Sequence, residues 1–168
     1  MTPHSLFPSP GTGEGDSAKP SGVRAVTAAS ENTPPQALTA WYAIAAAHDP
    51  ATAPARLDAL IAEDAIFESP VVHRPQPGRA LGVGYLTGAM HVLGGPAFRY
   101  TGEWLNADGA VLEFETEVDG IAINGVDILR FTPDGAQIAH FKVMIRPLKA
   151  IELVHRLMGQ ALAKTSAH

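Results

Sequence analysis

The sequence predicts an α+β domain in which helical segments precede a run of strands. Two observations support this prediction. Apolar residues recur at helical spacing in three segments before residue 94, whereas after residue 97 the pattern alternates with a period of two. Asp-Gly pairs at 108–109, 119–120 and 134–135 divide the second region into four strands with short connections. Strands joined by such tight turns pair in antiparallel fashion, so we expect a four-stranded meander.

Helices account for most of the first half and for the end of the chain. The first runs from about residue 33 to 48, and its apolar residues follow i, i+3, i+4, i+7 spacing: Leu38, Trp41, Tyr42 and Ala45. A shorter helix is expected at 52–61 and a third at 79–93, where three glycines indicate close packing against a neighbour. Residues 65–72 between them are typical of an extended segment. An amphipathic pattern over residues 147–162 predicts a final helix.

Composition narrows the setting. A hydrophobic content of 46% with 17% charged residues suits one compact domain. The net charge is −5 and the twelve Lys and Arg are scattered, so we expect no nucleic-acid partner. No apolar run approaches the roughly 20 residues that span a bilayer, and no secretion signal is visible, so we expect no membrane partner and a cytoplasmic location. The seven histidines show no metal-ligand spacing and cysteine is absent, so we expect no metal and no cofactor.

The chain divides into two unequal parts. Residues 1–32 are rich in Pro, Gly and Ser and have too little apolar surface to offset the entropy of ordering, so we expect this segment to be disordered. A regulatory tail is one alternative. The favoured interpretation is an unselected leader, or a start codon assigned too early with translation beginning further in. The ordered domain is expected at residues 33–164.

Asp127 lies in the middle of a predicted strand. The odd positions of residues 121–131 are the more apolar ones, so alternation directs this carboxyl toward the core. The nearest cations occupy the opposite, even positions: Arg130, Lys142 and Arg146. A carboxyl that is buried without a cation is expected to retain its proton, with a raised pKa.

The order of elements and several motifs resemble the nuclear-transport-factor-2-like superfamily over about residues 34–158. The segment "AEDAIFESPVV" is similar to the beginning of a strand in SnoaL-like polyketide cyclases and ketosteroid isomerases, and "GRALGVGYL" to the Gly-initiated helix after it. "VDILRFTPDGAQI" resembles the isomerase strand in which Asp precedes two apolar residues, Arg-Phe and a Gly turn. "FKVMIRPLKAI" is similar to the end of a SnoaL-like subgroup.

This resemblance implies a cone-shaped α+β barrel, in which a strongly bent antiparallel sheet wraps the N-terminal helices and a C-terminal helix follows. It also implies a deep apolar pocket and a homodimer formed through the outer sheet face. Asp127 matches the isomerase aspartate that donates a hydrogen bond to a developing enolate. Tyr42, or Trp41 in a shifted register, falls near the oxyanion-hole tyrosine. Ser69 occupies the position of the isomerase base and departs from the family, whereas in SnoaL-like cyclases a pocket aspartate mediates proton transfer directly.

The expected function is cofactor-free proton transfer on a hydrophobic carbonyl compound, of isomerase, cyclase or dehydratase type, with Asp127 and Tyr42 as catalytic candidates. The alternative is a non-catalytic ligand-binding or dimerisation module. A second titratable group within hydrogen-bond reach of Asp127 and open to the pocket favours the enzyme. A pocket filled by Phe131, Phe141 and Trp104 favours the module. The expected ligand-binding residues are Trp41, Ser69, Tyr85, Trp104, Phe114, Leu129, Phe131, Phe141 and Val143.

Other candidates near the pocket are expected to have no catalytic role. Alternation directs Glu68 away from the pocket if Ser69 points in, and His73 is expected to be a loop residue.

The even positions of the last strand mix apolar and charged side chains, from Ile138 to Arg146, which predicts a homodimer surface on the outer sheet face. Ile128 and Met144 are expected near its centre.

Overall fold

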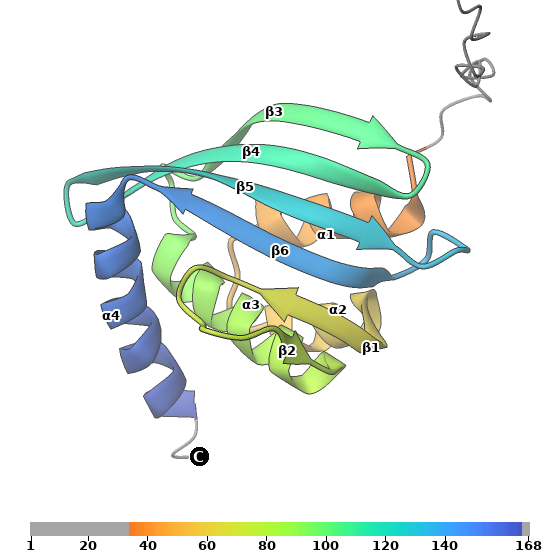
Figure 1. Ribbon diagram of the computed structural model, residues 1–168, viewed down its shortest axis with the longest axis horizontal. Helices are drawn as coiled ribbons and strands as arrows, with labels where there is room; N and C mark the ends of the chain where they lie inside the picture. The colour runs from red at the N-terminus through yellow and green to blue at the C-terminus, as the bar shows by residue number, and fades with distance from the viewer. Residues whose placement is uncertain (1–33, 166–168) are drawn as a thin grey trace, which may run out of the picture. The chain divides into compact units, whose positions relative to one another are not determined.

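The computed structural model describes residues 34–165, so the predicted disordered segment 1–32 lies outside the described residues. The first half contains α1 (Gln36–Ala47), α2 (Ala53–Leu60), β1 (Ile61–Glu68), β2 (Gln76–Pro77) and α3 (Arg79–Leu93). The second half contains β3 (Arg99–Asn106), β4 (Gly109–Val118), β5 (Ile121–Phe131), β6 (Ile138–Arg146) and α4 (Leu148–Thr165) (Figure 1). This order confirms the predicted α+β class. No helix within residues 34–165 is long and apolar enough to cross a membrane.

The strands form one six-stranded sheet in the order β2-β1-β6-β5-β4-β3. The predicted meander is confirmed, because β3, β4, β5 and β6 pair in sequence in antiparallel fashion. Strand β1 pairs with β6 in parallel, so the sheet is mixed rather than wholly antiparallel. The long connection between β1 and β6 removes the tight-turn constraint that forces antiparallel pairing. The sheet is strongly curved and remains open, with β2 and β3 as its edges.

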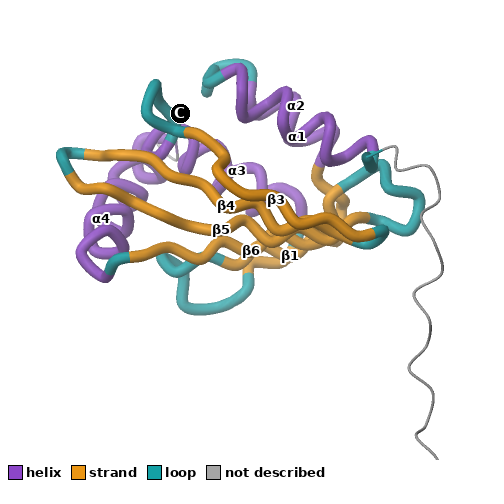
Figure 2. Tube along the Cα trace, turned by 90° about the horizontal axis from the view of Figure 1, so that it is seen from above, coloured by secondary structure: helices purple, strands orange, loops and turns teal. Residues whose placement is uncertain are grey.

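The helices cover one face of this curved sheet. Figure 2 shows α1 and α2 on one side of the strands and α4 at one end. Alternation along β4 confirms the predicted inner face, because Leu112, Phe114 and Thr116 are buried. Buried residues of α1, α2 and α3 complete this core, among them Leu38, Leu57 and Leu86.

The β4–β5 hairpin sets the direction in which Asp127 points. Asp119 and Gly120 adopt φ values of 51° and 72°, the left-handed pair required by a two-residue turn of the type favoured between twisted strands. The turn sets Val118 opposite Ile121, and the same register sets Leu112 opposite Asp127. Since Leu112 is fully buried, Asp127 faces the core as the alternation predicts.

A bulge changes the expected face of one residue in β6. Arg130 pairs with His140, but the next residue, Phe131, pairs with Ile138, so one residue of β6 is skipped. This skip reverses the alternation at the start of the strand. Ile138 is therefore fully buried, at 0% exposure, and its expected place on the outer face was wrong.

The glycines of α3 allow the close packing predicted for this helix. A Cβ atom built on Gly88 would lie 3.1 Å from Cε of Met158 in α4, and one on Gly82 would lie 3.6 Å from Cγ2 of Ile61 in β1. Larger side chains at these two positions would hold the neighbouring elements apart. The helix therefore lies close to both the sheet and α4.

Candidate functional site

An apolar cavity of about 80 Å³ lies between the helices and the inner face of the sheet. Its walls come from both parts of the hydrophobic core. Trp41, Phe67 and Phe141 belong to the part built around α1, α2 and β1, whereas Phe114 and Met158 belong to the part that α4 closes. The two parts do not close completely on each other, and the cavity occupies the space between them.

Among residues 34–165, two ionisable side chains line this cavity: Asp127 on β5 and His48 just after α1. Asp127 is only 5% exposed, whereas His48 is an exposed residue. Ser69 contributes an aliphatic hydroxyl to the wall, and its Oγ also accepts a hydrogen bond from the Val71 amide at 3.4 Å. The rest of the lining is predominantly hydrocarbon and aromatic, so any polar group of a ligand has few partners here.

The carboxyl of Asp127 is held in this apolar setting by one hydrogen bond. The Tyr100 hydroxyl donates to its Oδ2 at 2.7 Å. Burial raises the pKa of Asp127 to about 7, although the Tyr100 hydrogen bond acts in the opposite direction because it stabilises the charged form. Asp127 therefore carries its proton in most molecules below neutral pH.

Tyr100 is itself oriented by Trp41. The indole Nε1 of Trp41 donates to the Tyr100 hydroxyl oxygen at 2.7 Å, so a chain of donors runs from α1 through β3 to Asp127 on β5. Burial, followed by the adjacent charge of Asp127, raises the pKa of Tyr100 well above its usual value. Tyr100 therefore remains a donor when Asp127 is charged.

Sequence reasoning did not select Tyr100 as a functional residue. Alternation does place Phe98 and Tyr100 on one face of the predicted strand. The contact with Asp127, however, depends on the pairing of β3 with β4, in which Tyr100 lies opposite Phe114. That pairing crosses a bulge and is not readable from spacing alone.

Tyr42 does not reach Asp127. Its hydroxyl donates to Oε2 of Glu103, and burial together with this carboxylate raises the pKa of Tyr42 above its usual value. The Tyr42 ring packs edge-on against Tyr100, with ring centroids 5.7 Å apart. Successive helical residues point about 100° apart, so one of Trp41 and Tyr42 can face the sheet centre. The structure gives that place to Trp41.

Five of the residues expected to bind a ligand line the cavity, and four do not. The lining includes Trp41, Ser69, Phe114, Phe141 and Val143. Tyr85 instead stacks on Phe67, with centroids 5.3 Å apart and ring planes 7° apart. Leu129 and Phe131 are buried in the core around α1 and lie away from the cavity.

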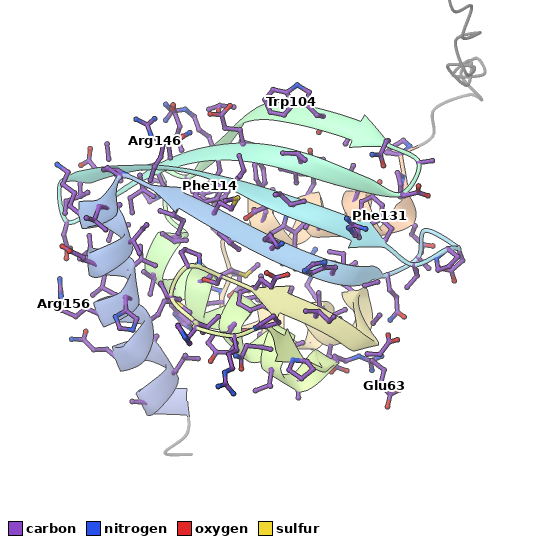
Figure 3. The ribbon with its side chains drawn as sticks, viewed as in Figure 1. Glu63, Trp104, Phe114, Phe131, Arg146 and Arg156 are labelled. Atoms are coloured by element: carbon purple, nitrogen blue, oxygen red, sulfur yellow. The ribbon has the colours of Figure 1, made fainter. Side chains whose placement is uncertain are left out.

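The fourth residue, Trp104, is 59% exposed on the edge strand β3, where Figure 3 shows it at the border of the sheet. The cause is the bulge between Tyr100 and Gly102, which changes the parity of the strand. Glu103 consequently lies opposite the buried Leu112, and Trp104 lies opposite Val111 on the other face. Strict alternation would have directed Trp104 inward.

Glu68 points away from the cavity, as the alternation predicts. Its Oε1 lies 2.8 Å from Nε2 of His140 and 3.3 Å from Nζ of Lys142 on the outer sheet face. Partial burial raises the pKa of Glu68, but the hydrogen bonds from Lys142 and His140 outweigh it and hold the pKa below its usual range. His73 is exposed in the connection between β1 and β2.

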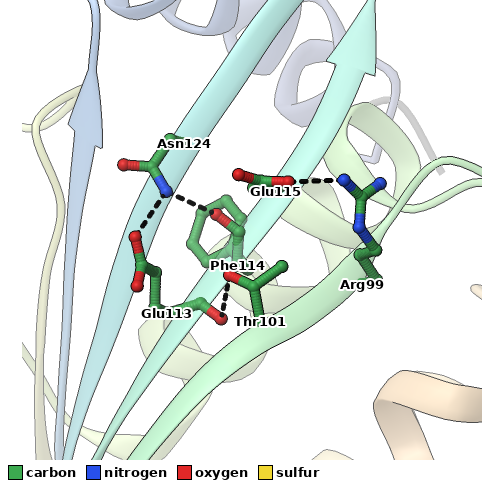
Figure 4. Close-up of polar contacts among 6 residues, drawn as sticks. All are labelled: Arg99, Thr101, Glu113, Phe114, Glu115 and Asn124. Atoms are coloured by element: carbon green, nitrogen blue, oxygen red, sulfur yellow. Dashed lines mark hydrogen bonds and ion pairs between the residues drawn. The ribbon is translucent and has the colours of Figure 1, made fainter.

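Polar contacts on the outer face hold together the strands that carry Tyr100 and Asp127 (Figure 4). Arg99 of β3 forms an ion pair with Glu115 of β4. Asn124 of β5 donates to Oε1 of Glu113 at 2.9 Å and to the carbonyl of Phe114 at 3.3 Å. Within the part of the chain that the structure describes, no group of three or more His, Asp or Glu side chains is placed to hold a metal ion.

The fold and the cavity together define a class: a curved α+β sheet that, with its helices, surrounds an apolar cavity containing a buried acid. Comparison with protein-family models and with curated proteins gives no match. Among solved structures, a steroid delta-isomerase from Pseudomonas aeruginosa is 30% identical, with a TM-score of 0.69 over 79% of this chain and 93% of that one. The chain therefore belongs to the nuclear-transport-factor-2-like superfamily, together with ketosteroid isomerase-like and SnoaL-like proteins.

Two further structures are similar. An uncharacterised bacterial protein with a cystatin-like fold from Silicibacter pomeroyi is 25% identical, with a TM-score of 0.66 over 75% of this chain and 84% of that one. A SnoaL-like polyketide cyclase-type protein from Jannaschia sp. is 8% identical, with a TM-score of 0.58 over 76% of this chain and 98% of that one. The second similarity concerns the fold alone.

Proposed function

We propose that the protein binds a hydrophobic carbonyl compound in the cavity and promotes its enolisation, as an isomerase, cyclase or dehydratase does. One observation carries this proposal: Asp127 is a buried acid in an apolar cavity, with a pKa raised to about 7 and one hydrogen bond from Tyr100. An acid of this kind suits a ligand oxygen that gains negative charge during the reaction. The similarity to a steroid delta-isomerase supports an isomerase-type reaction.

The geometry suggests how Asp127 acts. Protonated Asp127 donates to the carbonyl oxygen, and this hydrogen bond strengthens as the oxygen becomes enolate-like. If the proton passes to that oxygen, the carboxylate left behind keeps the donated hydrogen bond from Tyr100, which itself is held by Trp41. The apolar walls exclude competing water and increase the strength of both interactions.

A second function, binding without catalysis, is favoured by a different observation. Ser69 lines the cavity, and the sequence resemblance places it at the position of the isomerase base. A serine hydroxyl does not remove a proton at neutral pH without activation. Aromatic rings also occupy much of the wall, including Phe67, Phe98 and Phe141. This candidate requires ligand binding and predicts no proton exchange.

Two probes test the proposal without knowledge of the natural substrate. 1-Naphthol has a hydroxyl on an unsaturated ring carbon and mimics an enol, so its affinity reports binding beside Asp127. 1-Indanone has exchangeable hydrogens next to its carbonyl, so deuterium uptake followed by NMR reports enolisation. We expect wild type to accelerate this uptake, and Asp127→Asn to reduce the acceleration by about 100-fold or more, since the amide cannot give up a proton.

Asp58→Asn on the exposed face of α2 is the matched control and should retain the wild-type rate. Wild-type protein that binds 1-naphthol but takes up deuterium no faster than buffer would favour the binding module. Absence of both activities would contradict the proposal altogether.

A further inference from the structure

His48 occupies an unusual place at the edge of the cavity. It follows the last residue of α1, is exposed to solvent and also lines the cavity. Its ring lies edge-on to Phe98, another lining residue, with centroids 6.2 Å apart and planes at 73°. His48 therefore lies where the cavity meets the solvent, whereas Asp127 is buried within it.

The backbone of His48 is left-handed, with φ 45° and ψ 33°. Glycine is favoured at such a position after a helix because it has no Cβ to clash with the neighbouring carbonyl. Within residues 34–165 one other non-glycine residue has positive φ, Asp119, and the tight β4–β5 turn accounts for it. His48, in contrast, does not lie in a tight turn between paired strands, so its positive φ has no such explanation. What histidine adds over glycine there is an imidazole beside the cavity.

Among the described residues that line the cavity, Asp127 is the carboxylic acid, and His48 and Ser69 are the candidates for a proton acceptor. Asp127 supplies the acid, and Ser69 is a poor base. Imidazole accepts protons readily near neutral pH and is the group most often used as a general base. His48 is exposed to solvent at the edge of the cavity, whereas Asp127 is enclosed within it, so the two groups lie at different places along the same cavity.

We infer that His48 is the general base of the cavity, an inference that rests on the enolisation proposed above. In this step the imidazole takes the hydrogen from the carbon next to the carbonyl as a proton. The electron pair of the broken C–H bond forms the C=C bond, and the carbonyl oxygen takes the proton of Asp127. Return of the proton from His48 to the same carbon, and of the oxygen's proton to Asp127, restores the ketone. If the carbonyl compound is β,γ-unsaturated, the intermediate is a dienol, and return of the proton to its γ-carbon moves the double bond and completes an isomerisation without any net change in the protein.

The test combines three variants with the same two probes. His48→Gln retains a polar side chain of similar size but cannot act as a base. We expect it to reduce deuterium uptake by 1-indanone by about 100-fold or more while the affinity for 1-naphthol changes less than about twofold. His91→Gln, at an exposed histidine of α3 outside the cavity lining, is the matched control and should leave both measurements unchanged.

His48→Gly allows a test by chemical rescue, which a purely structural role of His48 would not predict. The variant should unfold at higher urea concentration than wild type, since glycine relieves the left-handed backbone. It should lose deuterium uptake, and free imidazole added to the solution should restore part of it. Restoration by imidazole would establish that the missing group is a base.

The outcomes separate this inference from the proposed function. If wild type does not accelerate uptake, both fail. If Asp127→Asn reduces uptake but His48→Gln retains at least half of the wild-type rate, enolisation stands and His48 is not its base. Loss of uptake in His48→Gly that imidazole does not restore would also overturn the assignment.

Discussion

Asp127 links the chemistry of the cavity to the stability of the fold. Its folded pKa of about 7 lies well above its ordinary value of 3.8, because burial disfavours the charged form. The Tyr100 hydroxyl is its hydrogen-bond partner, and the cations of the neighbouring strands lie on the outer face, where Lys142 binds Glu68. The folded protein therefore binds a proton that the unfolded chain has already released between about pH 4 and pH 7.

This difference in proton binding predicts a pH-dependent stability. The contribution of Asp127 is fully present below about pH 4 and is lost as the pH rises through about 7, at a total cost of roughly 4 kcal/mol. Asp127→Asn should flatten this decline and be neutral or stabilising at pH 7, whereas Asp58→Asn should keep the wild-type slope. Urea midpoints measured from pH 4 to pH 8 test this. A variant that is clearly less stable than wild type at pH 7 and converges with it in acid would refute the buried-acid interpretation.

At the scale of the elements, one glycine allows the cavity wall to pack against β5. Gly125 lies opposite Phe114 of β4 and Ile145 of β6. A Cβ atom built there would approach Cζ of Phe114 to 2.4 Å and the carbonyl oxygen of Met144 to 2.6 Å. The Phe114 ring therefore covers the glycine, and this position of the ring forms part of the cavity lining.

Gly125→Ala should accordingly destabilise the protein by roughly 1 to 3 kcal/mol, because both the ring and the β6 backbone obstruct the methyl group. The displaced ring should also weaken 1-naphthol binding. Gly84→Ala is the matched control: it lies in α3 with no atom within 4 Å of its built Cβ, so alanine should stabilise the helix by roughly 0.5 to 1 kcal/mol. Urea unfolding measures both changes. Equal stability of wild type and Gly125→Ala would show that the sheet can rearrange around the methyl group.

At the scale of the whole domain, the outer sheet face has no covering element among residues 34–165. Met144 and Ile66 are 56% and 41% exposed on this face, and Ile128, which lies opposite Lys142, is partly buried. Beside these apolar residues, the carboxylate of Glu68 pairs with the side chains of His140 and Lys142. A mixture of exposed apolar and internally paired charged groups is typical of an association surface, so we propose that two copies of the chain pair through it.

The proposed homodimer predicts an effect of charge at the centre of the face. Met144→Glu should raise the dissociation constant by about 10-fold or more, because association would bury an unpaired carboxylate. Leu81→Glu is the control, since Leu81 is a similarly exposed apolar residue of α3, on the helical side. Sedimentation at tens of micromolar should show a dimer for wild type and for Leu81→Glu. A wild-type monomer at that concentration would exclude the proposal.

The local pattern of residues was sufficient for much of this domain. Periods of 3.6 and 2 located the helices and the four strands of the meander, whereas β1 (Ile61–Glu68) begins before the extended segment predicted at residues 65–72. Asp119-Gly120 determined the β4–β5 register that directs Asp127 inward. These features can be predicted from the sequence because each depends on residues that are close together along the chain. The burial of Asp127 without a cation follows from the same alternation, and so does the outward direction of Glu68.

The pairing of distant strands decided the remaining features. The bulge in β3 turned Trp104 outward and Glu103 inward, and the bulge in β6 buried Ile138. A bulge changes the face of every following residue but leaves no trace in composition or period, since it depends on how two separate strands fit together. The contacts of Tyr100 with Trp41 and Asp127 join residues at least 27 positions apart, and the cavity forms only where two parts of the core meet. The end of α1, which carries His48, is defined by local sequence. Its neighbours in the cavity wall come from the rest of the chain, so only the tertiary packing places His48 beside the cavity.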